Sequence, residues 1–346
     1  MRNAVAPVLA ACLLFPTTAL ARPCGELSAD RAFQQAALVV KGWFEYTRIE
    51  GVPPPLGSDL TSIIRVDRVL KGATSRTRIA VTHFLCFENR IAMRTDRPLI
   101  AFVTASGSLV DGSAVLPASQ LNAAEVTDDP KATVRAEFLL GATDSDPIVA
   151  RAALGALAQL DGEASSAILR QAVDNPDLGV RVRALTWLTR FGDVDAFRRL
   201  TQTLSEWPFT PFSIPRLIQD DEGFSLAIAE DDVRHALYTL AVDPAVSTGS
   251  LFRTRAFLEL VTTVAQLDEL SLRRMAFQVM RHAEHSMFFP ILVNALTDPD
   301  KEIRRTAIYT LCNAMHAADL PCGPSYVETG EQRYVYRIRA WRKARQ

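Results

Sequence analysis

The sequence has almost no net charge, no familiar catalytic fingerprint and very little lysine. Its 38 basic and 39 acidic residues give a formal net charge of −1, so the chain as a whole does not attract nucleic acid or anionic lipid. It contains no G-x-S-x-G elbow, no H-E-x-x-H zinc helix, no P-loop and no dinucleotide-binding glycine fingerprint. These absences argue against an enzyme, and we expect no catalytic residue and no cofactor.

A long apolar run is also lacking beyond residue 22, so no transmembrane segment is expected there. The first 21 residues combine an early Arg2, an apolar stretch and Ala19-Leu20-Ala21, which is the layout of a secretory signal peptide. We therefore expect residues 1–21 to be removed and the protein to be periplasmic or secreted in a bacterium. Lipid anchoring through Cys12, which follows Leu-Ala-Ala, is the alternative.

The rest of the chain has few cysteines, and they fall into two groups. Cys24 and Cys86 lie in the N-terminal part, and Cys312 and Cys322 lie close together near the C-terminus. An even number in an oxidising compartment favours one disulfide in each group. A zinc site is the alternative at the second group, because His316 follows Cys312 at the i, i+4 spacing of one helix face.

The sequence does contain an internal repeat. Residues 167–185 align without a gap to residues 290–308, at an offset of 123 positions. Each segment leads from one apolar helix through an Asx-Pro step, Asn175-Pro176 or Asp298-Pro299, into a second helix. The Asx side chain is expected to cap free N–H groups, and the proline is expected to start the second helix.

Apolar residues at i, i+4, i+5 and i+8 recur on the expected second helices, with alanine where two helices approach closely. The sets are Val149-Ala153-Leu154-Leu157, Val180-Ala184-Leu185-Leu188, Leu272-Ala276-Phe277-Met280 and Ile303-Ala307-Ile308-Leu311. The first and last pairs of sets are each spaced by 31 residues. A period of this size predicts a solenoid, in which each hairpin is buried by stacking on the next.

This pattern resembles HEAT repeats, including the arginine that follows the first apolar anchor in Arg181, Arg273 and Arg304. The resemblance implies that these arginines pair with aspartates near second-helix starts and form a ladder along the stack. The first copy has Ala150 at this position, as an end repeat would. We expect an α-helical HEAT-like solenoid over residues 126–320, with an uncertain repeat count over residues 205–265.

Residues 22–125 have a different pattern. A short helical stretch at 28–37 precedes β-rich runs at 38–47, 59–69, 78–85 and 99–104, separated by Pro-rich and Gly-containing breakers. Short strands with one helix suggest a small β-barrel. The order of features, with Cys24, then Leu38-Val39-Val40-Lys41-Gly42, then Arg68-Val69-Leu70-Lys71-Gly72 and Cys86, resembles the netrin-like, metalloproteinase-inhibitor-like OB barrels.

In the inhibitors of that family, an N-terminal cysteine chelates the protease zinc through its amino group. The expected mature start here is Arg22, two residues before Cys24, which argues against inhibition and for a disulfide role of Cys24. The expected architecture is therefore a multidomain β + α chain, with a small OB-like barrel followed by the solenoid.

Several other clusters carry weaker signals. His282 and His285 could present two metal ligands, but the end of a helix also suits histidines. The acidic runs 220–222 and 230–232 lack the alternating ligands of a calcium loop. The basic tail, residues 321–346, interleaves arginine with aromatic residues, and we expect a packed element with a cationic face that could touch anionic lipid.

The segment 207–215 carries three prolines and three large aromatic residues, so it is expected to be a loop that interrupts the solenoid. Aromatic residues dominate protein interfaces, so Trp207, Phe209 and Phe212 are candidate partner contacts, although they could equally pack internally. The leading hypothesis is a non-enzymatic exported scaffold that binds a protein partner of unknown identity and no nucleic acid. A secreted protease inhibitor acting through the barrel and an unrecognised hydrolase are the alternatives.

Overall fold

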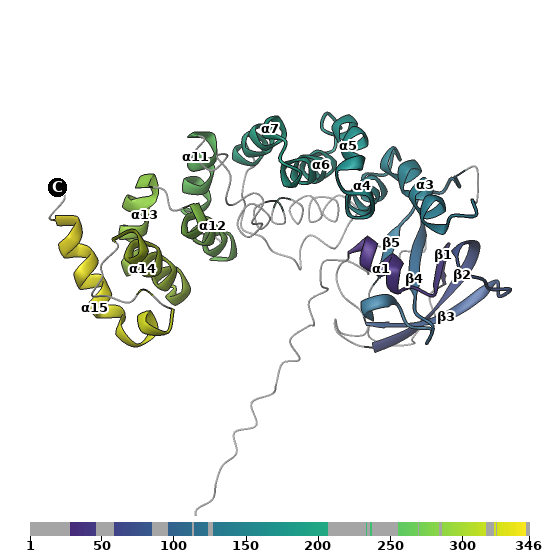
Figure 1. The fold of residues 1–346 in the computed structure, drawn as a ribbon, viewed down its shortest axis with the longest axis horizontal. Helices are drawn as coiled ribbons and strands as arrows, with labels where there is room; N and C mark the ends of the chain where they lie inside the picture. Colours follow the sequence, from purple (N-terminus) through teal and green to yellow (C-terminus); the bar gives the residue numbers. More distant parts are fainter. Residues whose placement is uncertain are drawn as a thin grey trace, which may run out of the picture. The chain divides into compact units, whose positions relative to one another are not determined.

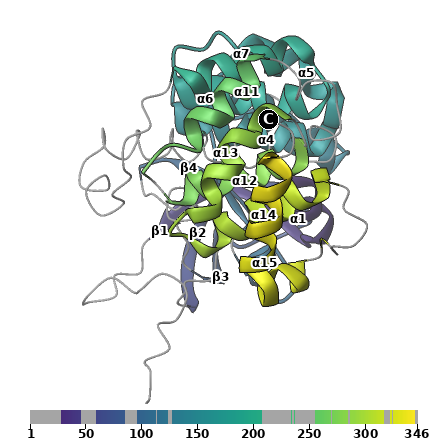
Figure 2. The ribbon, with the colours of Figure 1, turned by 90° about the vertical axis from the view of Figure 1, so that its left-hand side faces the viewer.

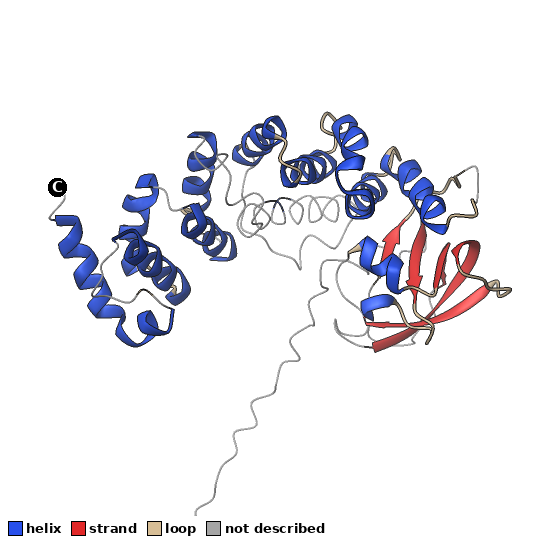
Figure 3. Cartoon of the chain, in the orientation of Figure 1, coloured by secondary structure: helices blue, strands red, loops and turns tan. Residues whose placement is uncertain are grey.

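The computed structural model describes residues 28–45, 59–84, 96–112, 114–123, 127–206, 233, 236, 255–268, 270–283, 286–315, 322 and 324–343. The chain divides into two compact units, Met1–Pro117 and Ala118–Gln346. The strands all belong to the first unit, and the second unit is helical in its described part (Figures 1 and 3).

The N-terminal unit is built on one antiparallel sheet with the strand order β3-β2-β1-β4-β5. Its elements are α1 (Ala29–Gln35), β1 (Leu38–Glu45), β2 (Asp59–Lys71), β3 (Arg78–Phe84), β4 (Pro98–Val103), the 3-10 helix η1 (Val110–Gly112) and β5 (Val115–Pro117). The ends of the helix and of the first four strands lie within two residues of the runs that the sequence predicts. The short β5 had no sequence signal.

One face of the sheet forms a continuous apolar core. Alternate residues of the strands point into it, namely Val40, Phe44, Ile64, Ile79, Val81, Leu99, Ala101, Val103 and Val115, together with Leu109. The central strand β1 contains Gly42, where the register with β2 shifts. A Cβ atom at Gly42 would lie 2.1 Å from the carbonyl oxygen of Arg65, so only glycine fits this close approach of two strands.

The predicted barrel closure is wrong, because the sheet is open. Its two edge strands, β3 and β5, do not pair with each other in the described part of the unit. β5 pairs with β4 over three positions. β3 is linked to the turn after β4 by one isolated parallel bridge, Thr82 to Ser108. A single bridge and a three-residue edge strand cannot replace the continuous ladder that a barrel requires.

The second unit is a succession of helices. They are α3 (Pro130–Ala142), α4 (Pro147–Asp161), η2 (Gly162–Ser165), α5 (Ser166–Ala172), α6 (Leu178–Arg190), α7 (Val194–Ser205), α11 (Arg255–Val264), α12 (Leu270–Ala283), η4 (Ser286–Phe288), α13 (Phe289–Asn294), η5 (Ala295–Thr297), α14 (Lys301–Met315) and α15 (Pro324–Lys343). Within the described residues, no helix is long and apolar enough to cross a membrane.

The four apolar sets found in the sequence lie on α4, α6, α12 and α14, and all members of each set are buried. These four are the second helices of their hairpins. Each packs against a first helix, in the pairs α3 with α4, α5 with α6, α11 with α12 and α13 with α14. Successive second helices also pack together, α4 on α6 and α12 on α14. The prediction of stacked hairpins is therefore confirmed for these segments.

Further contacts extend the stack between α7 and α11 and at its C-terminal end. The first helices α7 and α11 pack through the rings of Phe197 and Phe257, whose centroids are 5.6 Å apart. At the C-terminal end, α14 contacts both α13 and α15, and Figure 2 shows this end of the unit from the side. The close packing of α3 on α4 depends on Gly141, since a Cβ atom there would lie 3.0 Å from the Cβ of Ala153.

Candidate interaction surface on the helical repeats

The turn between the two helices of a hairpin has the same hydrogen bonds in both aligned copies. Asn175 Oδ1 accepts from the N–H of Asp177, and Asp298 Oδ1 accepts from the N–H of Asp300, at 2.9 Å in each case. The second aspartate, Asp177 or Asp300, then caps the helix by accepting from the N–H three residues later, at 2.9 and 3.0 Å.

This arrangement corrects one detail of the sequence interpretation. The first Asx residue caps the turn, not the helix, and the proline that follows it lies before the helix. The second helices begin at Leu178 and Lys301, two residues after Pro176 and Pro299. Both copies share the shift, because both carry a second aspartate at the better N-cap position.

An arginine in the first turn of the second helix completes each copy. Arg181 donates through Nη1 to the carbonyl oxygens of residues 175 and 176, both at 2.7 Å. Arg304 donates to the carbonyl oxygens of residues 298 and 299, at 2.8 and 3.0 Å. Each guanidinium thus satisfies two turn carbonyls with no intrahelical partner, which makes the hairpin turn rigid.

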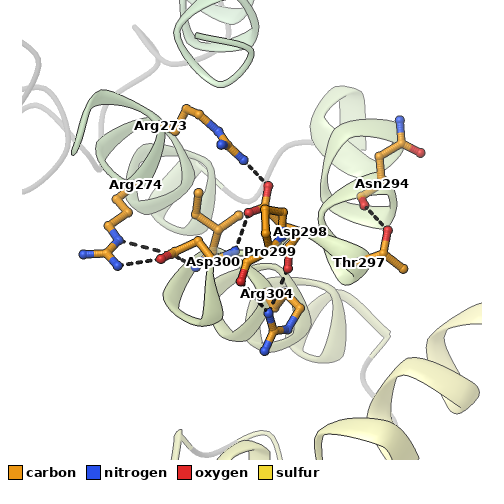
Figure 4. Close-up of polar contacts among 9 residues, drawn as sticks. Arg273, Arg274, Asn294, Thr297, Asp298, Pro299, Asp300 and Arg304 are labelled. Atoms are coloured by element: carbon orange, nitrogen blue, oxygen red, sulfur yellow. Dashed lines mark hydrogen bonds and ion pairs between the residues drawn. The ribbon is translucent and has the colours of Figure 1, made fainter. Parts of the chain in front are cut away.

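Arginines of one hairpin also reach the turn of the next. Arg273 on α12 pairs with Asp298, and its neighbour Arg274 pairs with Asp300 through two hydrogen bonds of 2.5 and 3.1 Å (Figure 4). Arg304 continues the series by pairing with Glu331 of α15 at 2.6 Å. We name Arg273, Arg274, Asp298, Asp300, Arg304 and Glu331 the arginine ladder. Arg273 makes the pairing with an aspartate that the resemblance implies, Arg304 pairs with a glutamate instead, and Arg181 donates to carbonyl oxygens of its own turn.

One pair of the ladder, Arg274 and Asp300, shifts the pKa of both its members. The hydrogen bond from Arg274 has the largest effect and lowers the pKa of the Asp300 carboxyl. Burial opposes it, and the N–H of Ile303 lowers the pKa further by a smaller amount. The same pair raises the pKa of Arg274. An equivalent effect occurs at the start of α7, where the N–H of Ala196, followed by Arg170, lowers the pKa of Asp193. These carboxylates are held in their charged form.

The first hairpin lacks the ladder arginine, as the sequence predicts for an end repeat. Arg151, beside Ala150, is almost fully buried and donates through Nε to the carbonyl oxygen of Pro147 at 3.2 Å. Arg135 of α3 pairs instead with Asp161 at the end of α4. Because the ladder groups are occupied by contacts between and within hairpins, they have a structural role.

A second group of arginines lies along the second helices and contacts aromatic rings. Arg281 of α12 lies over the ring of Tyr309 on α14, with 4.3 Å between the guanidinium carbon and the ring centroid. Arg190 lies over the ring of Trp187 on the same helix, α6, also at 4.3 Å. Between α12 and α14, Gln278 contacts the hydroxyl of Thr306 at 3.5 Å.

These residues are partly exposed, apart from Trp187. Arg190, Gln278, Arg281 and Tyr309 are half-buried, whereas Trp187 is only 6% exposed. Arginine and aromatic residues are enriched at the centres of protein interfaces. We name Arg190, Gln278, Arg281 and Tyr309 the second-helix row and treat it as the candidate interaction surface.

The C-terminal segment that the sequence marks as a basic tail contains the 20-residue helix α15. Tyr334 and Ile338 are buried, and Trp341 meets Phe289 of α13 edge to face, with 5.9 Å between the ring centroids. A disulfide joins Cys312 of α14 to Cys322, just before α15. This is the pairing that the clustering of cysteines predicts, and it removes the thiols that a zinc site would need.

Several predicted positions lie outside the described residues. They are Cys12 and the rest of residues 1–21, Cys24, Cys86, the aromatic segment with Trp207, Phe209 and Phe212, His285, His316 and the two acidic runs. Among the residues that the structure describes, no group of three His, Cys, Asp or Glu side chains is arranged to hold a metal ion.

Comparison with known families identifies the helical part. Models of HEAT repeats match residues 126–208 and residues 288–315. The region 126–315 therefore contains HEAT repeats, as the arginine pattern predicts, and no family is assigned to the N-terminal sheet. No curated protein sequence matches the chain.

One solved structure with some similarity is the crystal structure of an engineered protein. It shares 14% identity with this chain, with a TM-score of 0.32, and the match covers 59% of this chain and 95% of the engineered one. A likeness of this size supports no inference about function.

Proposed function

We propose that the helical unit is a non-enzymatic scaffold that holds a protein partner on its second-helix row. The observation that carries the proposal is that the HEAT hairpins use one set of arginines for stacking and hold a second, half-exposed set over aromatic rings. The first set cannot be released to a partner without opening the stack. The second set contributes half-exposed cationic and aromatic groups, the residue types that anchor protein interfaces.

Site-specific photo-crosslinking tests this proposal. A photoreactive amino acid replaces Gln278 in the second-helix row, and in a matched control it replaces Gln202, an exposed glutamine on the first helix α7. We expect one discrete crosslinked protein from position 278 in producing cells, a weaker product when Arg281 is also changed to alanine, and none from position 202. Equal labelling of the same proteins from both positions would refute the assignment of this surface.

The aromatic segment predicted from the sequence is a second proposed contact. Crosslinking from position 278 is repeated in the triple variant Trp207→Ala, Phe209→Ala, Phe212→Ala. Loss of the crosslinked product would show that the aromatic segment and the second-helix row belong to the same interface. An unchanged product restricts the interface to the second-helix row.

We further propose that the scaffold works outside the reducing cytosol. The Cys312–Cys322 disulfide supports this location, because disulfides persist mainly in oxidising compartments. Fractionation of producing cells, followed by thiol labelling before and after reduction, tests it. Recovery in the cytosolic fraction with both thiols free would contradict the proposal.

A further inference from the structure

The outward face of the C-terminal helix α15 carries a cationic surface that the scaffold function does not use. Over residues 331–341 its inward side contacts the chain itself, through buried Tyr334 and Ile338, the Trp341–Phe289 ring contact and the Arg304–Glu331 ion pair. These contacts hold this part of the helix on the last hairpin.

The exposed positions form one arc of the helix. They are Gln332, Arg333, Tyr336, Arg337, Arg339, Ala340 and Lys343. At about 100° per residue, Tyr336 and Ala340 lie near the middle of this arc. Arg339 and Lys343 lie towards one margin, and Arg333 and Arg337 lie towards the other. Tyr336 is 74% exposed, the largest exposure among the exposed large apolar or aromatic side chains in the described residues.

The charges on this arc differ from those of the arginine ladder. Residues 333–343 contain four arginines and one lysine but no acidic residue. Among the described residues, Arg333, Arg339 and Lys343 form no ion pair, whereas every ladder arginine faces a carboxylate. Because the whole chain has a net charge of only −1, attraction of an anionic partner requires a local cationic patch such as this one.

We propose that the outward face of α15 binds the surface of an anionic lipid bilayer. From Arg333 to Lys343 the arc extends about 15 Å along the helix, so it can lie along a flat surface. Tyrosine favours the headgroup level, and arginine and lysine side chains on both flanks can reach lipid phosphates. Among the described side chains of this helix Tyr336 is the one exposed ring, and a single ring offers no platform on which successive nucleotide bases could stack.

Vesicle binding by the full chain tests the proposal. The vesicles are phosphatidylcholine alone, or a mixture with three parts phosphatidylglycerol to seven parts phosphatidylcholine. We expect the protein to sediment with the mixed vesicles at low salt, and to be released by molar sodium chloride, because salt screens the attraction. All variants keep residues 1–346, so the apolar start of the chain contributes equally to each.

Substitutions locate the binding surface. Changing Arg333, Arg337, Arg339 and Lys343 to glutamine is expected to lower the partition coefficient about six-hundredfold, since each of the four cations near an anionic surface contributes about fivefold. Tyr336→Ala is expected to lower it several-fold. The matched control changes four exposed cations elsewhere, Arg76, Arg198, Arg255 and Lys301, and is expected to leave binding within about twofold.

Each other outcome overturns the proposal. No preference for the anionic vesicles would do so, as would an equal fall in the control variant. Polyglutamate or a short single-stranded oligonucleotide could also compete with the vesicles. If either one abolished vesicle binding at a concentration at which it binds the protein directly, the face would be assigned to an acidic polypeptide or to a nucleic acid. The variants alter exposed side chains, and unchanged circular dichroism and an intact Cys312–Cys322 disulfide check that α15 stays in place.

Discussion

The arginine ladder makes a quantitative prediction for the pair Arg273 and Asp298. The Arg273 and Asp298 side chains are only 20% and 10% exposed, so their charges are largely removed from water. Asp298 also accepts the N–H of Asp300 within its turn. In Arg273→Ala, the Asp298 carboxylate stays buried without its cation. We expect the free energy of unfolding of the helical unit to fall by about 3 kcal/mol, the lower end of the range for breaking a buried pair.

The assay is urea unfolding followed by the helical circular dichroism signal, with a double-mutant cycle. Asp298→Asn removes the charge but keeps an acceptor for the turn. The double variant leaves no unpaired charge, so it is expected to cost less than the sum of the two single variants by at least about 1 kcal/mol.

A matched control uses Arg255→Ala. Its partner Glu259 forms the same kind of ion pair, but the side chains are 89% and 59% exposed. We expect no measurable change, because solvent screens exposed pairs. If Arg273→Ala behaved like Arg255→Ala, or if the two ladder substitutions were simply additive, the ladder would not couple the hairpins and this reasoning would be refuted.

Three further predictions concern other parts of the structure. Because the pKa of Asp300 is lowered by folding, its stabilising effect is complete above the unfolded-state pKa and is lost as the pH falls through the folded-state value. Asp300→Asn should therefore flatten the acid side of a stability profile measured by thermal unfolding. Cys312→Ser should lower the stability of the C-terminal end by about 2 to 3 kcal/mol, as should reduction of the wild type, measured by hydrogen exchange in α15. Gly42→Ala should prevent folding of the N-terminal unit, because its Cβ would overlap the Arg65 carbonyl; proteolysis should then degrade this unit.

The helical unit was largely predictable from the sequence because its signals are local. A hairpin shows its buried face as a spacing of apolar residues within nine positions, so each of the four sets could be recognised separately. All of them are buried. The ladder was also predictable, because the arginine recurs at a fixed place in three of the four sets, at Arg181, Arg273 and Arg304. The helix cap was assigned less well. Each turn has two Asx residues, and only the structure shows which of them caps the second helix.

The N-terminal unit shows the limit of this approach. Strand positions follow from short apolar runs, and four of the five strands were predicted. Closure into a barrel depends on which edges meet, and that is decided by contacts far apart in the sequence. The short β5 (Val115–Pro117) and the isolated bridge from Thr82 to Ser108 leave no periodic signal. The second-helix row was missed for a related reason, because Arg281 and Tyr309 meet across two helices.

The arginines of the helical unit suggest how a HEAT stack can change partners without losing its fold. Ladder arginines such as Arg273 face carboxylates in the next turn, and their loss should destabilise the stack. Ring-stacked arginines such as Arg281 lie over a polarisable ring, and a cation–π contact at an exposed site is worth about 0.5 to 1 kcal/mol. Substitution at the second-helix row should therefore alter binding far more than stability. A comparison of Arg281→Ala with Arg273→Ala, by crosslinking yield and by urea unfolding in parallel, would separate the two roles. If both variants lost stability equally, the second-helix row would be needed for stacking of the hairpins and would not be a separate binding surface.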